Sequence, residues 1–343
     1  MVQKSVRIQD VAKAAGVSTA TVSRALSNPD LLTESTRTAV FEAIRDTGYR
    51  VNRAARNLRM QKAGAVLVLV PNLSNPFFSI ILAGLSEGMT GSDYSILIAD
   101  THNEQSRGHQ LVDYFLDSRI DGMISLDGGL PMKELSALTD NGVGNKIVFA
   151  CEWVADTTFP SIRSDNRKGV ALAIQHLYDL GHRKIAHVTG PADNVLTHAR
   201  RSSVLEQRQK LGLPTREEWI IRGDFSLDSG QDAARQIIAM ENRPTAVFCA
   251  SDQVAFGLIS TLHAHGIRVP EDISVVGFDD IGLSASYIPA LTTVRQDRRS
   301  LGLQAARTLL NALDRGPLTK ESHITYVDVE LVVRDSTAPI KTD

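Results

Sequence analysis

The chain has 343 residues, of which 43% are hydrophobic and 22% are charged, so its composition is that of a globular protein with two or three domains. It has no apolar run of membrane-spanning length and no basic segment followed by an apolar one at its start, which predicts a cytoplasmic protein without a membrane partner. The net charge of −2 hides an uneven distribution: residues 1–62 hold 11 Lys+Arg and 5 Asp+Glu, whereas the rest of the chain holds 26 Lys+Arg and 34 Asp+Glu. A polyanion is therefore expected to bind the basic head and not the acidic body.

The first 50 residues have the pattern of a helix-turn-helix domain. Apolar residues at helical spacing predict a helix over 8–15, which Gly16 ends. Ser18 is suited to cap a second helix, and Thr33 to cap a third one that extends to about Asp46. Two short helices joined by a glycine-containing turn are typical of proteins that place the second helix in the major groove of DNA.

The outward face of the second helix carries small polar groups and one arginine, namely Thr19, Ala20, Ser23 and Arg24. An arginine can donate two hydrogen bonds to guanine, and a threonine methyl can contact the methyl group of thymine. The same residues could form an ordinary solvated helix face, and spacing alone does not separate the two interpretations. The positive charge of the head favours DNA.

The segments DVAKAAGVSTATVSRALSNP, TRTAVFEAIRDTGY and NRAARNLR resemble the DNA-binding head of the LacI/GalR family of bacterial transcription regulators. The resemblance implies that residues 52–59 are a hinge helix that orders on operator DNA. It also implies that Leu58 is an apolar wedge inserted into the minor groove, although an ordinary buried leucine is the alternative. The implied DNA-binding residues are Arg7, Ser18, Thr19, Ala20, Thr21, Ser23, Arg24, Asn28, Thr33, Asn52, Arg53, Ala55, Leu58 and Arg59.

Two positions of the head depart from the family pattern. Val51 stands where the family usually has proline before the hinge asparagine, which predicts a looser entry into the hinge helix. Arg7 stands where the family often has a threonine or serine cap. Either Ser5 caps the first helix from further back, or Arg7 supplies a phosphate contact instead.

From residue 64 onward, short apolar strands alternate with amphipathic helices. This alternation predicts an α/β fold with parallel sheets covered on both faces, in two doubly wound lobes that bind a ligand between them at the carboxyl ends of the strands. The expected strands are 65–70, 95–99, 122–126, 146–150, 184–190, 219–222, 245–250 and 274–280, and the expected helices are 77–90, 104–118, 166–180, 194–212, 227–240 and 252–265.

The segments VPNLSNPFF, LGHRKIAHVTGP and VPEDISVVGFDD resemble the periplasmic sugar-binding-protein fold, which the family uses as its effector domain. In that fold the last part of the chain crosses back between the lobes. The resemblance implies a helix-turn-helix domain over 1–50, a hinge helix and linker over 51–63, and an effector-binding and dimerisation domain over 64–343, whose lobes are about 64–162 plus 292–325 and 163–291 plus 326–343.

Candidate effector-binding residues follow the predicted strands. Paired phenylalanines suit the apolar face of a sugar ring, although they could be hydrophobic core at a helix start, and an arginine fork suits vicinal hydroxyls or a carboxylate. Ser251 and Ser203 replace the asparagine and glycine that are usual in the family. The implied effector-binding residues are Asn75, Phe77, Phe78, Glu152, Trp153, Arg200, Phe225, Ser251, Asp279 and Gln296.

These features together predict a homodimeric, sequence-specific transcriptional repressor that binds a near-palindromic operator and responds to a small polyhydroxylated effector such as a sugar. The set of effector residues resembles the pentose-binding version of the fold, whereas Cys151-Glu152-Trp153 resembles the nucleoside-responsive branch of the family. A nucleoside-responsive regulator is therefore one alternative, and a cytoplasmic sugar-binding protein whose head has another role is a second.

An enzyme is the least favoured class. The sequence has no Walker-type phosphate loop, no nucleophile elbow and no histidine pair at metal-ligand spacing. Cys151 and Cys249 are expected to be reduced, buried thiols, so neither a metal nor a cofactor is predicted. The C-terminal segment RDSTAPIKTD has no heptad pattern, which argues against a tetramer held by a coiled coil.

Overall fold

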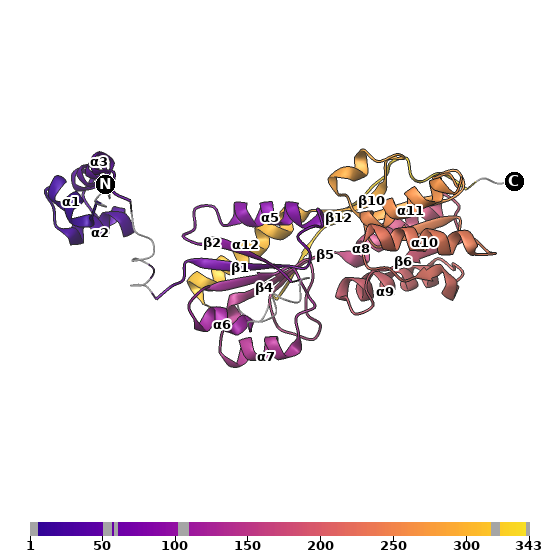
Figure 1. Ribbon diagram of the computed structural model, residues 1–343, viewed down its shortest axis with the longest axis horizontal. Coiled ribbons are helices and arrows are strands. Elements are labelled where there is room, and N and C mark those ends of the chain that lie inside the picture. The colour runs from indigo at the N-terminus through magenta and orange to yellow at the C-terminus, as the bar shows by residue number, and fades with distance from the viewer. Residues whose placement is uncertain (1–5, 51–56, 58–60, 102–109, 317–322, 341–343) are drawn as a thin grey trace. The chain divides into compact units, whose positions relative to one another are not determined.

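The computed structural model describes residues 6–50, 57, 61–101, 110–316 and 323–340 (Figure 1). The chain forms two compact units, a helical head that ends at Ala63 and an α/β body that begins at Gly64. No helix in the described ranges combines the length and the apolarity needed to span a lipid bilayer.

Within residues 6–50, the head has three α-helices around a small apolar core. Its elements are α1 (Ile8–Ala14), α2 (Thr19–Ser27), the 3-10 helix η1 (Pro29–Leu31) and α3 (Glu34–Thr47). The predicted caps are confirmed, because Thr21 N donates to Ser18 Oγ (3.1 Å) and Thr36 N donates to Thr33 Oγ1 (3.4 Å). The buried core consists of Val11, Ala12, Val22, Ala25, Val40 and Ala43.

The body contains two six-stranded sheets, one in each lobe. In the first lobe the strand order is β11-β5-β4-β3-β1-β2, and all pairs are parallel. The elements of this lobe are β1 (Ala65–Val70), α5 (Phe77–Gly88), β2 (Ser95–Asp100), α6 (Leu111–Leu116), β3 (Gly122–Ser125), α7 (Met132–Asp140), η3 (Gly144–Lys146), β4 (Ile147–Ala150), β5 (Ser161–Ser164), α12 (Arg298–Arg315) and β11 (Ile324–Val327).

In the second lobe the strand order is β12-β10-β9-β8-β6-β7, and only β12 runs antiparallel to its neighbour. The elements are α8 (Asn166–Asp179), β6 (Ile185–Val188), α9 (Val195–Lys210), η4 (Glu217–Trp219), β7 (Ile220–Ile221), α10 (Leu227–Ala239), β8 (Ala246–Cys249), α11 (Asp252–Ala264), β9 (Ser274–Asp279), η5 (Gly282–Ala285), β10 (Thr292–Gln296) and β12 (Val329–Val332).

Alternating side chains of β1 show why the first sheet is buried on both faces. Val66, Val68 and Val70 belong to the core formed with α5 and α12, whereas Leu67 and Leu69 belong to the core formed with α6 and α7. Fully burying each such side chain contributes about 1.5–3 kcal/mol. The prediction that helices cover both faces of the sheet fails at the edge strand β2, where Leu97 and Ile98 are 43% and 48% exposed.

The approximate lobe boundaries predicted near residues 292 and 326 both lie further along the chain in the structure. β10 pairs with β9 in the second sheet, Thr292 opposite Val276, so this strand does not belong to the first lobe. β11 continues to Val327 in the first sheet. The sequence pattern also missed β5, whose segment SIRS is too short and too polar to be recognised as a strand.

In the described part of the chain, the lobes are joined by three connections, each of which contains an aspartate. Asp165 lies between β5 and α8, Asp297 between β10 and α12, and Asp328 between β11 and β12. Asp165 and Asp297 cap the helices that follow them, because their Oδ1 atoms accept from Lys168 N and Ser300 N, both at 2.9 Å. The chain therefore leaves these two crossings with a fixed direction.

Glycines allow α5 and α12 to approach closely in the first lobe. A Cβ atom on Gly302 would lie 2.0 Å from the carbonyl oxygen of Ile81, and one on Gly84 would lie 2.1 Å from that of Arg299. A side chain at either position must push one backbone away from the other. The two helices are therefore expected to move together.

We expect Gly302→Ala to lower the free energy of unfolding by about 2–3 kcal/mol, because the added methyl group overpacks the contact between the helices. Urea unfolding of the full chain would measure this loss. Gly282→Ala is the matched control, since a Cβ atom there meets nothing within 4 Å. Equal unfolding midpoints for the two variants would contradict the close contact.

Candidate functional site

The exposed face of α2 carries the residues predicted to read DNA. Thr19, Ala20, Ser23 and Arg24 are all exposed, while Val22 and Ala25 on the opposite face are buried against the other helices. Thr21 is partly buried, and its Oγ1 lies 2.9 Å from Ser18 Oγ. The helix therefore presents one small polar face that a major groove can accommodate.

The remaining DNA-binding predictions divide into described and undescribed positions. Asn28 and Thr33 are exposed next to η1. Arg7 is exposed at the start of α1, where its backbone N–H donates to Asp10 Oδ2 (2.8 Å). This acidic side chain caps the helix start, so the guanidinium of Arg7 is not needed for capping. Outside the described residues lie Ser5, Val51, Asn52, Arg53, Ala55, Leu58 and Arg59.

Most of the predicted effector-binding residues lie at the carboxyl ends of strands in the body. Several of them, or their direct neighbours, have a backbone that L-residues rarely adopt, with φ values of +69° at Cys151, +68° at Phe225, +130° at Asp279 and +52° at Asp280. Each such residue costs roughly 1–3 kcal/mol, and strain of this kind gathers at ligand sites. The strand ends around these positions are therefore a candidate site.

Asp279 is the acidic centre of the site in the second lobe. It is 8% exposed, and its Oδ1 accepts from Gln296 Nε2 at 2.7 Å, which links the ends of β9 and β10. Burial raises the pKa of Asp279 to about 7, although the nearby Arg200 guanidinium opposes this shift. The carboxyl group is thus poised between its neutral and ionised forms near neutral pH.

This raised pKa predicts how stability depends on pH. Since the folded state holds the Asp279 proton more tightly than the unfolded state, stability should fall as pH rises from about 4 to about 7 and then level off. The contribution is at most about 4 kcal/mol. Thermal unfolding of the wild type and of Asp279→Asn across this range would isolate it, and parallel profiles would contradict the assignment.

Arg200 on α9 is buried beside Asp279. It is 2% exposed, its Nε donates to Asn166 Oδ1 (2.8 Å), and its Nη1 donates to the carbonyl oxygen of Ala250. Its guanidinium lies 3.8 Å from the ring centroid of Phe278. Burial lowers the pKa of Arg200, while Asp279 raises it. These contacts hold the guanidinium plane in a single orientation.

Glu152 joins the two lobes. Its Oε2 accepts from Gly128 N in the first lobe and its Oε1 accepts from Asn194 Nδ2 in the second, both at 3.0 Å. Burial raises the pKa of Glu152. The neighbouring Trp153 is partly buried, and the guanidinium carbon of Arg163 lies 4.2 Å from its ring centroid.

The phenylalanine pair starts α5 in the first lobe. Asn75 Oδ1 accepts from Phe77 N (3.0 Å), and the rings of Phe77 and Phe78 meet edge to face with centroids 5.1 Å apart. Both rings are 6% exposed and belong to the buried core. Most of the surface of both rings is therefore hydrophobic core, which was the alternative interpretation of the sequence. Only the ring edges remain available to a ligand.

Phe225 and Ser251 complete the second lobe's part of the site. Ser251 Oγ accepts from Val254 N as the cap of α11 and lies 3.2 Å from the carbonyl oxygen of Phe225. The Phe225 ring centroid lies 5.9 Å from the guanidinium carbon of Arg200. Ser203, the other departure from the family pattern, donates its hydroxyl to Ala199 O (2.9 Å) within α9, so the helix accommodates it.

Sequence reasoning missed several polar residues that contact this site. Asn166 and Asn194 orient Arg200 and Glu152, and both follow strands or turns that the apolar pattern did not resolve. Arg298, the first residue of α12, is 9% exposed, and its guanidinium carbon lies 5.8 Å from the Phe77 ring centroid. Its Nε is buried without a hydrogen-bond partner among the described residues. The run of polar residues directly after β10 could have indicated that Arg298 lies near the site.

Comparisons with known proteins match both units. Residues 7–52 match a family model for bacterial regulatory proteins of the lacI family, and residues 174–337 match one for a periplasmic binding protein-like domain. The chain is 34% identical over 330 residues to the HTH-type transcriptional repressor CytR of Escherichia coli (strain K12), covering 96% of each chain. It is 32% identical over 329 residues to the HTH-type transcriptional repressor PurR of Actinobacillus pleuropneumoniae, covering 96% of this chain and 97% of that protein.

Solved structures extend the likeness to three dimensions. The lac repressor dimer bound to operator and the anti-inducer ONPF has a TM-score of 0.81 and 29% identity, covering 98% of this chain and 100% of that chain. A complex of the transcriptional regulator CelR with cellobiose has a TM-score of 0.72 and 30% identity, covering 96% of this chain and 99% of that chain. With a helix-turn-helix head, a two-lobed body and relatives aligned over nearly its whole length, the chain belongs to the LacI family and is a DNA-binding transcriptional repressor.

Proposed function

We propose that this repressor binds a near-palindromic operator as a homodimer, and that a small polyhydroxylated effector held between the two lobes of the body changes its affinity for that operator. The observation that carries the effector role is a buried group in which Arg200 of α9 accompanies Asp279 and Gln296 at the carboxyl ends of β9 and β10. A buried carboxylate and guanidinium without a ligand-binding role would be costly to retain in a stable lobe.

The chemistry of the site supports a ligand with several hydroxyl groups. Asp279 can accept from hydroxyls, the amide of Gln296 can both donate and accept, and the planar fork of Arg200 suits vicinal oxygens. The Nε of Arg298, which finds no hydrogen-bond partner in the described part of the chain, is a further donor that an effector oxygen would satisfy. The edges of Phe77 and Phe78 would contact the apolar face of a ring.

Related solved structures support a sugar. One complex contains CelR and cellobiose, and a LacI family regulator from Enterococcus faecium, 26% identical with a TM-score of 0.69 over 81% of this chain, contains bound ribose. A nucleoside is the second candidate, because it combines a ribose with a planar base and Cys151-Glu152-Trp153 resembles the nucleoside-responsive branch of the family.

Dimerisation is supported by apolar side chains that a single subunit leaves in water. Ile80, Leu97 and Ile98 in the first lobe and Leu283 and Ile288 in the second are exposed. Large apolar side chains on a surface are typical of protein interfaces. Light scattering is expected to give twice the mass of one chain, and the related lac repressor structure is a dimer on its operator.

Two experiments test the proposal as a whole. Purified protein is expected to select a subset of genomic fragments in a gel shift with competing random DNA, and equal affinity for all fragments would refute operator recognition. A thermal-shift screen of sugars, sugar phosphates and nucleosides should identify a stabilising ligand that alters this gel shift. The relatives found are regulators, which supports the expectation that the chain is not an enzyme.

A further inference from the structure

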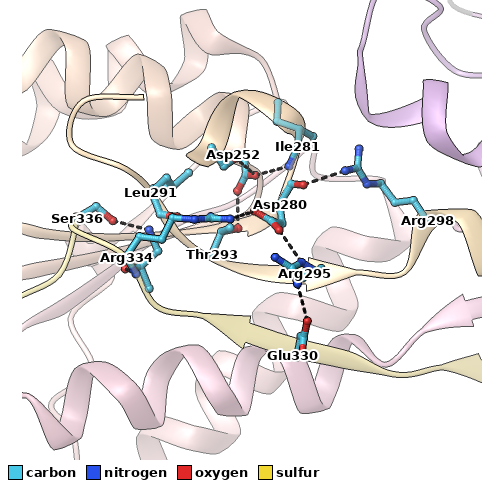
Figure 2. A network of polar contacts seen from close by, with 12 residues as sticks. Asp252, Asp280, Ile281, Leu291, Thr293, Arg295, Arg298, Glu330, Arg334 and Ser336 are labelled. Atoms are coloured by element: carbon cyan, nitrogen blue, oxygen red, sulfur yellow. Dashed lines mark hydrogen bonds and ion pairs between the residues drawn. The ribbon is translucent and has the colours of Figure 1, made fainter. Parts of the chain in front are cut away.

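Asp280, which directly follows Asp279, lies at the centre of an ionic cluster (Figure 2). Its Oδ2 accepts from Arg295 Nε at 2.6 Å, and its Oδ1 lies 2.7 Å from Arg334 Nη2. Its backbone carbonyl oxygen accepts from Arg298 Nη2 at 2.8 Å. Only 9% of the Asp280 side chain is exposed, and its partner Arg334 is 16% exposed, whereas Arg295 is 46% exposed. The ion pair with Arg334 is therefore less solvated than the pair with Arg295, and its attraction is less screened by water.

The arginines of this cluster come from segments that are far apart in the sequence. Arg295 lies on β10 and is also paired with Glu330 of β12 through Nη1 and Oε1 at 2.8 Å. Arg334 follows β12 and donates through Nη1 to the carbonyl oxygen of Leu291 at 2.7 Å. The carboxylate of Asp280 therefore holds the turn after β9 against β10 and the C-terminal segment of the chain.

The turn after β9 is held from its other side as well. Ile281 N donates to Asp252 Oδ2 (2.9 Å), and Asp252 Oδ1 accepts from Thr293 Oγ1 (2.5 Å) (Figure 2). Between these two anchors, Asp279 and Asp280 keep their positive φ values. A strained backbone persists only where its surroundings fix it, so the contacts of Asp280 hold Asp279 in its present conformation.

Arg298 connects this turn to the first lobe. It begins α12, which packs on α5 through the close backbone contact at Gly302. The other end of this connection is Phe77 at the start of α5, whose ring centroid is 5.8 Å from the guanidinium carbon of Arg298. The Asp280 carbonyl oxygen thus links the acidic centre of one lobe to the aromatic pair of the other.

We propose that Asp280 is a positioning residue of the effector site: clamped by Arg295 and Arg334, it aims Asp279 at Gln296 and, through Arg298, couples occupancy of the site to α12 of the first lobe. This inference rests on the proposed effector function of Asp279. Adjacent carboxylates then have separate roles, since Asp279 contacts the effector and Asp280 contacts protein only.

The sharpest variant is Arg334→Met, because Arg334 touches none of the proposed effector-binding residues. Its loss should weaken binding of the effector by about tenfold, the scale on which residues remote from a ligand change coupling between sites. Asp280→Asn should give a similar loss, since asparagine tolerates the same positive φ and removes only the charge. The double variant should be no worse than either single one. Asp232→Asn, which breaks an exposed ion pair with Arg235 on α10, is the control.

Binding would be measured by calorimetry on the full-length protein with ribose, cellobiose and the four common ribonucleosides as probes. The inference is supported if the wild type binds at least one probe, the control binds that probe equally well, and both variants bind it about tenfold more weakly. Unchanged affinity in Arg334→Met overturns it. If no probe binds the wild type, the proposed effector classes are wrong, and hydrogen exchange still tests the coupling. Arg334→Met should speed exchange at Ile281 and in the first turn of α12, and unchanged exchange there would sink the inference.

Discussion

Replacing Asp279 with alanine is expected to weaken effector binding by about 100-fold, because a buried site designed around a hydrogen-bonding group rejects the partner once that group is lost. Gln296 Nε2 would lose its 2.7 Å acceptor, and Arg200 would lose the carboxylate that interacts with it most strongly. Operator affinity in the absence of effector should stay within about twofold, since no residue of the head is altered. Calorimetry and fluorescence anisotropy on an operator fragment would measure the two quantities.

A second variant separates the loss of the carboxylate from the backbone strain at this position. Asp279→Gly also removes the carboxylate, but glycine adopts a φ of +130° without strain. Both variants should lose the effector response, and the thermal midpoint should be higher for the glycine variant. If the alanine variant alone lost the response, the backbone conformation rather than the carboxylate would be responsible.

Arg24→Ala is expected to reduce affinity for the operator by about 10- to 100-fold, the usual effect of removing one arginine that contacts bases. Its side chain is exposed on α2, so the stability of the head should be nearly unchanged. Anisotropy on operator and random fragments at several salt concentrations would separate base recognition from phosphate contact.

Arg45→Ala provides the matched control for this measurement. Arg45 is also exposed in the head, in the last turn of α3, but it lies outside the predicted reading face. Its loss should weaken binding to all DNA only slightly. An equal loss for Arg24→Ala on operator and random DNA would show that Arg24 contacts phosphates and does not read sequence.

Local signals in the sequence were sufficient for much of the fold. Ser18 and Thr33 predicted the starts of two helices because capping depends on residues three positions apart. The apolar run of β1 predicted a strand buried on both faces. β5 was missed because SIRS carries polar residues, and its pairing depends on strands far away in the chain.

The candidate site was predictable to the extent that it follows strand ends. Asp279 and Gln296 end neighbouring parallel strands, so their contact follows from the order of the sheet. The contact of Glu152 with Asn194 cannot be predicted from the order of a sheet, because it depends on how the two lobes pack against each other. The sequence likewise gave no indication that Asp280 would be clamped, since both arginines that bind its carboxylate lie beyond residue 290.

The aspartate-bearing crossings at Asp165, Asp297 and Asp328 have a consequence for the integrity of the body. Because the polypeptide passes from one half to the other more than once, a protease that nicks a single crossing cannot release either half. Nicked protein should migrate as one species in a native gel and separate into fragments only in denaturant. A body joined in this way can be cut at one crossing and still keep both lobes in one particle.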